Sequence, residues 1–442
     1  MIHTLYIFIL ALTVRLINLY FNQIDSTNSY LLEDQLMYWD WSLKNAYTAK
    51  SSIDPNLLLE RMPGSFIFFQ FAIWVVGENL FGVLVMQTII DSITCVIIAF
   101  IAKSLNKKLF FLAGVVASFS PLLIIVSSQI LSDTLFLFFL SISILFILTF
   151  IKQKKESLIY LGALFLSLAL FTRVVVLPLI FIIPIYILYF CYKERYYVLK
   201  VIRIISIFII ISFTFSFPRM ISNYFNFNTI SLTSQSGSHF AYWVLPAVLD
   251  FDSSDKKDLY KANIQDLNKT LEEKNNPFER SSLLKKEALN FLLSTEKKII
   301  FLAWSKGAIL NILGPPFIID HRFRSFPHPS FYENDRNLLR WLSIIFSKDK
   351  FKSYKFLLCV SIIFSLLFIF LSLYGFILIY KNYFQDSIIL LIISVYFIAV
   401  TGPVFSPKYI HPIMPLLIIL EVVAIRRVFE FFLKNIINKK SN

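Results

Sequence analysis

The sequence predicts a polytopic, all-α integral membrane protein. Of its 442 residues, 57% are hydrophobic and 16% are charged, and the mean hydropathy is +0.69. Soluble domains carry roughly 25% charged residues, so this composition excludes a soluble globular chain. Apolar runs of about twenty residues, enough for a helix to cross a bilayer, recur along the chain. The net charge of +14 comes from basic residues that mostly flank these runs. That pattern is typical of membrane topology and argues against nucleic acid as a partner.

About ten transmembrane helices are expected from these runs. In chain order they lie at residues 2–21, 80–104, 109–128, 133–151, 157–172, 174–192, 198–216, 355–380, 386–402 and 411–432. The first run is too long for a signal-peptide core and has no small-residue cleavage site, so we expect it to stay as an anchor. Lys and Arg gather in alternate loops, which the positive-inside rule assigns to the cytoplasm. Both termini are therefore expected in the cytoplasm, with an even number of spans.

Two further apolar segments are too short to be read as spans. Residues 299–313 are interrupted by Lys306, and residues 63–76 are of similar length, so we expect both to lie along the outer face or to re-enter it. The chain is then one membrane domain over residues 1–442. Its predicted parts are an acidic first extracytoplasmic loop at 22–79, a large extracytoplasmic loop at 217–354, and a three-helix membrane segment at 355–442.

An acidic and aromatic segment, residues 30–41, follows the first predicted span. It brings the carboxylates of Glu33, Asp34 and Asp40 to the membrane face, and Arg61 follows in a basic Met-Pro-Gly motif. A carboxylate held there beside aromatic residues and an arginine is a candidate reaction centre. A solvated loop could have the same composition, so this segment alone leaves both interpretations open.

Three charged residues from later in the chain are expected on the same outer face. Asp133 opens the fourth predicted span, Arg173 lies between the fifth and the sixth, and Lys408 precedes the tenth. Ionisable groups at membrane depth cost a few kcal/mol unless they are paired or used. Each residue by itself is more often structural. Together with Asp34 and Arg61, they predict a polar cavity that tolerates an anion.

The order of these motifs resembles the GT-C superfamily of membrane glycosyltransferases. Within it, the chain looks most like the bacterial branch related to protein O-mannosyltransferases and lipid A aminoarabinose transferases. That branch has an acidic residue after the first span with Tyr four residues later, and then a basic residue with Pro-Gly. The matching positions are Asp34, Tyr38 and the motif Arg61-Met-Pro-Gly64.

Later motifs of the family follow in the same order over nearly the whole chain. They are matched by Pro121 with Asp133, by Leu170-Phe-Thr-Arg173, and by Lys408-Tyr-Ile-His-Pro-Ile-Met-Pro415. One motif departs from the pattern. Pro218-Arg-Met-Ile-Ser-Asn-Tyr224 has Ser222 where the family has Arg, which leaves open whether Arg219 takes its place.

The resemblance implies transfer of one sugar from a polyprenyl-phosphate donor to a lipid, glycan or protein acceptor on the outer leaflet. A phosphate leaving group needs cations more than a general acid, so one carboxylate base with several cations suffices. A glycosidase would need two carboxylates facing each other across the bond. We expect Asp34 to be the base, with Arg61, Arg173 and Lys408 at the phosphate. The expected location is a bacterial inner membrane, with the site on the extracytoplasmic face.

The remaining site candidates have less defined roles. Asp133 is expected to position the acceptor or, together with Asp34, to hold a divalent metal. Because no histidine-rich cluster accompanies these carboxylates, no cofactor is expected. Further candidate substrate-binding residues are Tyr38, Arg219, Tyr409 and His411. His411 could equally be an ordinary interfacial histidine.

Asp91 supports an alternative function, since it lies roughly 16 Å inside the second predicted span by helical rise. A carboxylate at that depth could relay protons in a secondary transporter. Its structural interpretation is an ion pair with Arg15 or a hydrogen bond with Thr94. The sequence shows no matched pair of broken spans, which argues against a transporter. A flippase or polymerase of lipid-linked glycans stays a further alternative.

Overall fold

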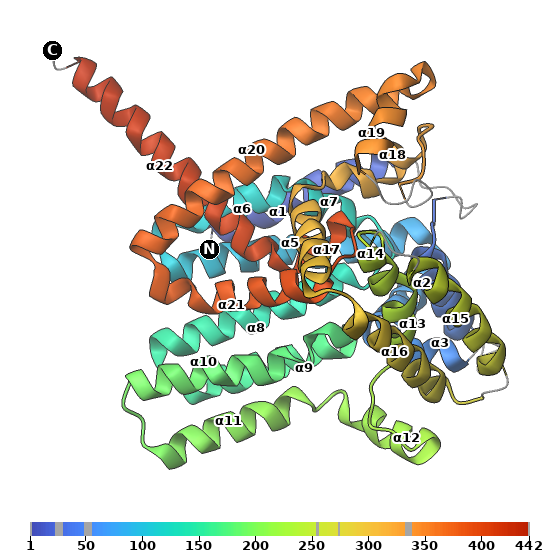
Figure 1. The fold of residues 1–442 in the computed structure, drawn as a ribbon. Coiled ribbons are helices and arrows are strands. Elements are labelled where there is room, and N and C mark those ends of the chain that lie inside the picture. Colours follow the sequence, from blue (N-terminus) through green and yellow to red (C-terminus); the bar gives the residue numbers. More distant parts are fainter. Residues whose placement is uncertain are drawn as a thin grey trace.

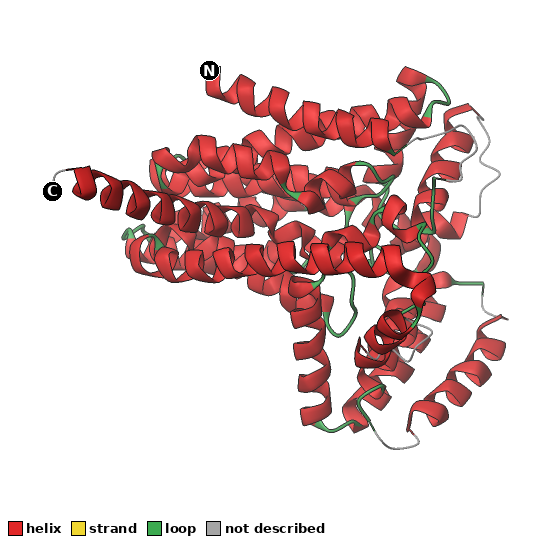
Figure 2. Cartoon of the chain, turned by 90° about the horizontal axis from the view of Figure 1, so that it is seen from above, coloured by secondary structure: helices red, strands yellow, loops and turns green. Residues whose placement is uncertain are grey.

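The structure is a computed structural model that describes residues 2–22, 30–47, 55–252, 256–272, 275–331 and 338–440. Within these ranges the chain forms helices and no strand (Figure 2). The predicted all-helical fold is therefore confirmed. Figure 1 shows a bundle of long helices, with a group of shorter helices covering one of its ends.

The bundle consists of apolar helices from both halves of the chain. They are α1 (Ile2–Phe21), α5 (Leu80–Leu105), α6 (Phe110–Phe119), α7 (Pro121–Ser127), α8 (Asp133–Gln153), α9 (Glu156–Thr172), α10 (Leu179–Lys193), α11 (Val198–Ser212), α20 (Lys352–Asn382), α21 (Phe384–Thr401) and α22 (Met414–Lys440). Helix α8 packs on α5 and α9, α1 packs on α5 and α6, and α20 packs on α22. At Gly375, α20 approaches the backbone of Leu420 in α22 so closely that a Cβ would collide with it.

The shorter helices come from the two predicted loops. The first loop forms α2 (Asp34–Tyr47), α3 (Pro55–Glu60) and α4 (Gly64–Val76). The second forms α12 (Phe217–Phe227), α13 (Gln235–His239), α14 (Leu245–Leu249), α15 (Lys256–Glu272), α16 (Pro277–Ser294), α17 (Lys297–Leu313), α18 (His321–Arg324) and α19 (Leu338–Ser347). Three short turns are used below: η4 (Pro316–Ile319) joins α17 to α18, whereas η2 (Val174–Val176) joins α9 to α10 and η7 (Pro407–Ile413) joins α21 to α22 in the bundle.

Five of the described helical segments are long and apolar enough to cross a membrane: Ile2–Phe21, Leu80–Leu105, Asp133–Gln153, Val174–Lys193 and Asp349–Asn382. Two bent helix pairs raise the number to seven if each is one span. The predicted spans 157–172 and 386–402 correspond to the shorter apolar helices Glu156–Thr172 and Ser387–Thr401. The protein is thus helical with several apolar spans, and the number ten stays a prediction.

The predicted third span is broken at a proline. Segment Lys107–Phe119 is followed by Pro121–Ser127 at an angle of 54°. Pro121 has no backbone N–H to continue the preceding helix, so it starts α7 in a new direction. The residues after α7 consequently turn back towards the start of α8.

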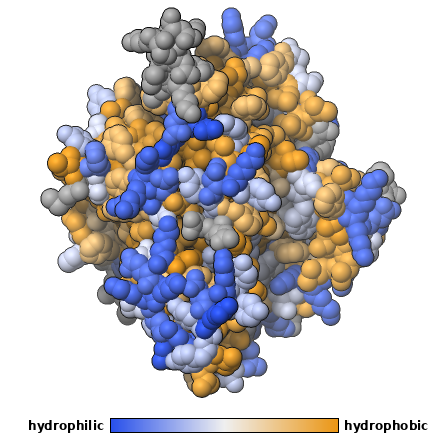
Figure 3. Space-filling view, turned by 90° about the vertical axis from the view of Figure 1, so that its left-hand side faces the viewer, coloured by the Kyte–Doolittle hydropathy of each residue, from blue (hydrophilic) through white to orange (hydrophobic). Residues whose placement is uncertain are grey.

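The two ends of the bundle differ in character. Both termini lie towards one end, away from the short helices (Figures 1 and 2). Viewed from that end, hydrophilic residues gather on the surface (Figure 3). Basic residues occupy the last turns of α5, α8, α10 and α20, namely Lys103, Lys152, Lys193 and Lys381. This distribution matches the side that the positive-inside rule predicts to be cytoplasmic.

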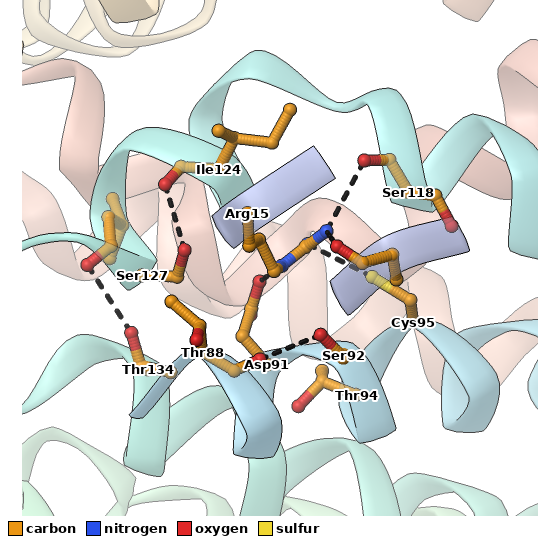
Figure 4. A network of polar contacts seen from close by, with 12 residues as sticks. Arg15, Thr88, Asp91, Ser92, Thr94, Cys95, Ser118, Ile124, Ser127 and Thr134 are labelled. Atoms are coloured by element: carbon orange, nitrogen blue, oxygen red, sulfur yellow. Dashed lines mark hydrogen bonds and ion pairs between the residues drawn. The ribbon is translucent and has the colours of Figure 1, made fainter. Parts of the chain in front are cut away.

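A buried ion pair joins α1 to α5 (Figure 4). Arg15 and Asp91 both have fully buried side chains, and Arg15 Nη2 lies 2.5 Å from Asp91 Oδ2. Arg15 also donates to the carbonyls of Ala11 and Ser118 and to the Sγ atom of Cys95. The predicted pairing of Asp91 with Arg15 is confirmed. Thr94, the other predicted partner, donates to a backbone carbonyl of its own helix instead.

Candidate active site

Asp34, the predicted base, is the first residue of α2 and lies between two cations. Arg61 Nη2 is 3.1 Å from its Oδ1 atom, and Lys408 Nζ is 3.9 Å from its Oδ2 atom. The three residues come from α2, from the turn before α4 and from η7. Their side chains are 39%, 25% and 26% exposed respectively. Ion pairs this exposed stabilise a protein little, so the cations remain available to an incoming anion.

The Pro-Gly motif explains how Arg61 reaches this position. At Gly64, the first residue of α4, a Cβ would lie only 2.7 Å from the carbonyl oxygen of Phe171. Because Gly64 has no side chain, α4 can begin directly against the end of α9. That close approach brings Arg61, three residues earlier, to the same end of the bundle as Arg173.

Arg61 has two further neighbours on α13 that the sequence did not point to. With the amide of Gln235 oriented so that its oxygen faces Arg61, that oxygen accepts from Nη1 at 3.1 Å and from Nη2 at 3.2 Å. Burial lowers the pKa of His239, and the positive charge of Arg61 lowers it further. Asp34 and Gln235 together fix the orientation of the guanidinium.

A second ion pair, between Asp133 and Arg173, lies at the mouth of α8. Asp133 opens that helix with a side chain only 5% exposed, whereas Arg173 at the end of α9 is 27% exposed. The Arg173 guanidinium also lies over the Phe136 ring, 5.6 Å from its centroid. The positive charge of Lys408 also acts on Asp133, and His411 is a further electrostatic neighbour. Lys408, whose Nζ lies 3.9 Å from Asp34, therefore interacts electrostatically with both acidic residues.

Hydrogen bonds between side chains and the backbone hold the turn between α7 and α8, which leads into Asp133, against α2 and α5. Tyr30 donates to the carbonyl of Ser128 at 2.6 Å, and Gln35 Oε1 accepts from the N–H of Ile130 at 3.3 Å. Gln87 in α5 donates to the carbonyls of Ser127 and Gln129 at 2.8 and 2.7 Å. Irregular backbone at membrane depth needs such partners. Since Tyr30 and Gln35 flank Asp34, the same bonds position the two acidic residues relative to each other.

Tyr38 lies one turn after Asp34 on α2 and is buried. Its ring packs on Phe66 with the centroids 4.6 Å apart. Burial raises the pKa of its hydroxyl, while the charges of Arg61 and Arg173 act in the opposite direction. Tyr38 thus lies within electrostatic range of both cations. Tyr409, which lies in η7, also interacts electrostatically with Arg173.

Two of the predicted site residues are engaged differently from the others. Arg219 on α12 donates from Nε to the carbonyl of Leu232 at 2.6 Å and from Nη2 to the carbonyl of Leu58. The bond to Leu58 ties α12 to α3 just before Arg61, so these contacts link Arg219 to the site indirectly. His411 is fully buried, and neither ring nitrogen has a hydrogen-bond partner among the residues that the structure describes. The charges of Asp133, Asp91 and Arg173 interact electrostatically with the His411 ring.

The segment after α17 also folds over the acidic first loop. Arg324 on α18 pairs with Glu33 at 2.8 Å, and Arg322 pairs with Asp320 at 2.6 Å. The ring of His321 packs on Tyr30 with centroids 5.0 Å apart. Glu33 is 75% exposed. Its pair with Arg324 is therefore a surface contact, adjacent to Asp34 in sequence but separate from the Arg61 and Lys408 pairs.

Residues 61–217 match the family model described as dolichyl-phosphate-mannose-protein mannosyltransferase. The match supports a membrane glycosyltransferase of the GT-C superfamily. It covers about a third of the chain and includes Arg61, Asp133 and Arg173, whereas Asp34 and Lys408 lie outside it. No curated protein is similar enough to the chain to count as a match.

Replacing Arg61 or Lys408 by Gln is expected to lower kcat/KM for a polyprenyl-phosphate sugar about tenfold to a hundredfold. The reason is that hydrogen bonds to charged groups contribute about 1.5–3 kcal/mol. The matched control is Arg324→Gln, which removes an exposed arginine that pairs with Glu33 rather than Asp34. The measurement is donor-dependent steady-state kinetics of the purified protein. Equal kinetics for all three variants would contradict a role of Arg61 and Lys408 at the phosphate.

Proposed function

We propose that this chain transfers a single sugar from a polyprenyl-phosphate donor to an acceptor hydroxyl at the extracytoplasmic face of the membrane. The observation that carries this proposal is the meeting of Arg61, Asp34 and Lys408 from three distant parts of the chain. The family match supports the glycosyltransferase class and the lipid-phosphate donor. The basic clusters at the opposite end of the bundle support the sidedness.

In the proposed reaction, Asp34 accepts the proton of the acceptor hydroxyl as its oxygen attacks the anomeric carbon. The bond from that carbon to the phosphate oxygen breaks, and the polyprenyl phosphate leaves with the electron pair. Arg61 and Lys408, which flank Asp34, neutralise the charge that develops on the phosphate. A leaving group that is already a stable anion needs no general acid, which is why one carboxylate base suffices.

The ion pair between Asp133 and Arg173 supplies the other proposed substrate contacts. Arg173 lies on the phosphate side and holds Asp133, whose carboxylate positions the acceptor. Tyr38 on α2 and Tyr409 on η7 both interact electrostatically with Arg173, and we assign them to the sugar or the phosphate. His411 has two free ring nitrogens among the described residues and can hydrogen-bond a bound group that enters beside Asp133.

An apolar groove offers a place for the polyprenyl chain. It lies between α10 and α21, has a volume of about 510 Å³, and is lined by Ile182, Phe384, Ile388, Leu391, Ile392, Val395, Tyr396 and Ala399. Ligand sites in proteins commonly measure about 300–1,000 Å³ and are mostly apolar. Tyr396 donates to the carbonyl of Val175, two residues after Arg173. One lining residue of the groove therefore contacts the segment that follows Arg173.

Chelation by EDTA is expected to leave the transfer rate unchanged. Asp34 faces Arg61 and Lys408, and Asp133 is paired with Arg173, so each carboxylate already has a cationic partner within the protein. A divalent ion between Asp34 and Asp133 would have to displace these cations. The measurement is the transfer rate after EDTA treatment and again after Mg²⁺ or Mn²⁺ is restored. Loss with EDTA and recovery with the metal would assign the two aspartates to a metal site instead.

The proposed function is tested by incubating the purified chain with polyprenyl-phosphate sugars and an acceptor-containing membrane extract. Release of polyprenyl phosphate, followed by mass spectrometry, is expected for at least one donor. The groove is tested separately with a photoactivatable polyprenyl phosphate. It should label α21, with labelling reduced by Arg61→Gln combined with Lys408→Gln. No release from any mannose, glucose or aminoarabinose donor, together with no labelling of α21, would overturn the proposal.

A further inference from the structure

Helix α12 has three distinct sides, which its sequence spacing places around the helix axis. Phe217, Ile221, Tyr224 and Phe225 follow the i, i+4, i+7, i+8 pattern of a single stripe. Arg219, Ser222, Asn223 and Asn226 lie together on another side. Met220 and Phe227 form the third side, where Met220 packs on the main core and Phe227 packs on the Phe278 ring of α16.

The stripe is exposed although it is apolar. Phe217, Ile221, Tyr224 and Phe225 are 57%, 41%, 54% and 80% exposed. Such a contiguous apolar patch on one short helix indicates a surface that contacts a membrane or another protein. On the polar side of the helix, two residues bond to the neighbouring backbone. Asn223 is buried and donates to the carbonyl of Ser231 at 2.7 Å, and Arg219 donates to two backbone carbonyls.

The position of α12 in the chain indicates that the membrane covers the stripe. It follows α11, an apolar helix whose exposed residues include Val198, Leu199, Ile202 and Ile210. The axis bends by 63° between α11 and α12, and α12 projects sideways from the bundle beside the short helices (Figure 1). The stripe therefore comes directly after a helix that also has exposed apolar residues. With eleven residues, α12 is about 16 Å long and cannot span a bilayer.

We propose that α12 lies flat in the outer leaflet, with the apolar stripe in the acyl boundary and the bilayer surface as its partner. An amphipathic helix in this position buries its apolar face about 5–10 Å deep. Helix α4 repeats the same spacing with Ile67, Phe71, Trp74 and Val75, all at least 50% exposed. Its Trp is a residue type favoured at membrane interfaces. An exposed apolar stripe on a second short helix fits the same interfacial placement.

This placement connects the bilayer surface to the proposed active site. Arg219 holds the carbonyl of Leu58, and the N–H of Ser234 donates to the carbonyl of Leu59 at 2.8 Å. Both contacts reach α3, which leads directly into Arg61. Helix α12 thus holds the Arg61 segment at a fixed height above the leaflet where a lipid-linked donor carries its phosphate. Only this consequence rests on the proposed function, because the position of α12 is independent of sugar transfer.

The test uses spin labels on single cysteines in the full chain, reconstituted in lipid bilayers. The native residues are first replaced by Cys95→Ser, Cys191→Ala and Cys359→Ala. Labels are placed at Phe217, Ile221 and Phe225 on the stripe. Ser222 and Asn226, both exposed on the polar side, provide the matched controls. Collision with oxygen and with a water-soluble nickel chelate gives the depth of each label, and a label at Ile202 on α11 confirms the reconstitution.

The stripe labels are expected to collide with oxygen, to be shielded from nickel, and to lie at one depth within about 3 Å. The labels at Ser222 and Asn226 are expected to show the reverse. A transmembrane α12 would separate Phe217 from Phe225 by about 12 Å in depth. That separation would overturn the proposal, as would stripe labels open to nickel in water. Immobile labels shielded from both reagents would also overturn it, because a protein partner would then cover the stripe.

Discussion

Replacing Asp34 by Asn is expected to abolish sugar transfer while the protein is still expressed, inserted and folded. Asn keeps the shape of the side chain and can still accept a hydrogen bond from Arg61, but it cannot accept the acceptor's proton. General base catalysis contributes about 10²–10⁴-fold, so the expected loss in kcat is of that size. The measurement is the transfer rate of the purified, reconstituted variant.

The control for this substitution is the neighbouring residue. Glu33→Gln removes a carboxylate that is 75% exposed and pairs with Arg324. It should leave kcat within about twofold, because surface ion pairs contribute little to stability and Glu33 does not contact Arg61 or Lys408. If Asp34→Asn kept activity within a few-fold of the wild type, or if both variants lost activity equally, Asp34 would not be the base.

The second large effect is expected from the buried pair between α1 and α5. Asp91→Asn leaves the fully buried Arg15 without a counter-charge, and breaking one partner of such a pair costs about 3–5 kcal/mol. Replacing both residues, by Arg15→Met with Asp91→Leu, should restore most of that stability because no unpaired charge remains. The measurement is thermal unfolding of the full chain in detergent, with Ser104→Ala as the control substitution in α5.

Substitution of the Arg15–Asp91 pair also distinguishes an enzyme from a proton-coupled carrier. If Asp91 is structural, folded Asp91→Asn protein should still transfer sugar, although less of it survives heating. A carrier would instead keep its fold and lose the coupling of uptake to the pH gradient. Unchanged stability combined with lost proton-linked uptake would contradict the structural role that the contacts of Arg15 indicate.

The residues of the candidate site could be named from the sequence because their motifs occur in a characteristic order. Which of these residues pair with each other could not be predicted from the sequence. Whether Asp34 meets Arg61, Arg173 or Lys408 depends on how α4, α9 and η7 pack, and hydrophobic patterning contains no information on that. Gln235 and His239 were missed for the same reason. They lie on a short helix without any local motif, about 170 residues after the arginine they approach.

Arg219 and the predicted spans show two further limits of prediction from the sequence. Arg219 was a candidate because Ser222 stands where the family has Arg, and its role at the substrate stays a prediction. In the structure its Nε and Nη2 atoms donate to the carbonyls of Leu232 and Leu58. A one-dimensional motif cannot distinguish an arginine that binds a ligand from one that satisfies backbone oxygens. The predicted third span ignored the break at Pro121, since hydropathy records apolar length but not the direction of a helix. By contrast, Arg15 could be named as a partner of Asp91, because two opposite charges in apolar helices rarely stay apart.

The central claim is tested most directly by sugar transfer in proteoliposomes that contain the purified chain and a radiolabelled polyprenyl-phosphate sugar. Proton-linked uptake is followed in the same vesicles. We predict that label moves from the lipid donor to the acceptor with the wild type and with Glu33→Gln, and that Asp34→Asn transfers none. No transfer from any donor tried, with uptake that Asp91→Asn uncouples from the pH gradient, would contradict the account and identify a transporter.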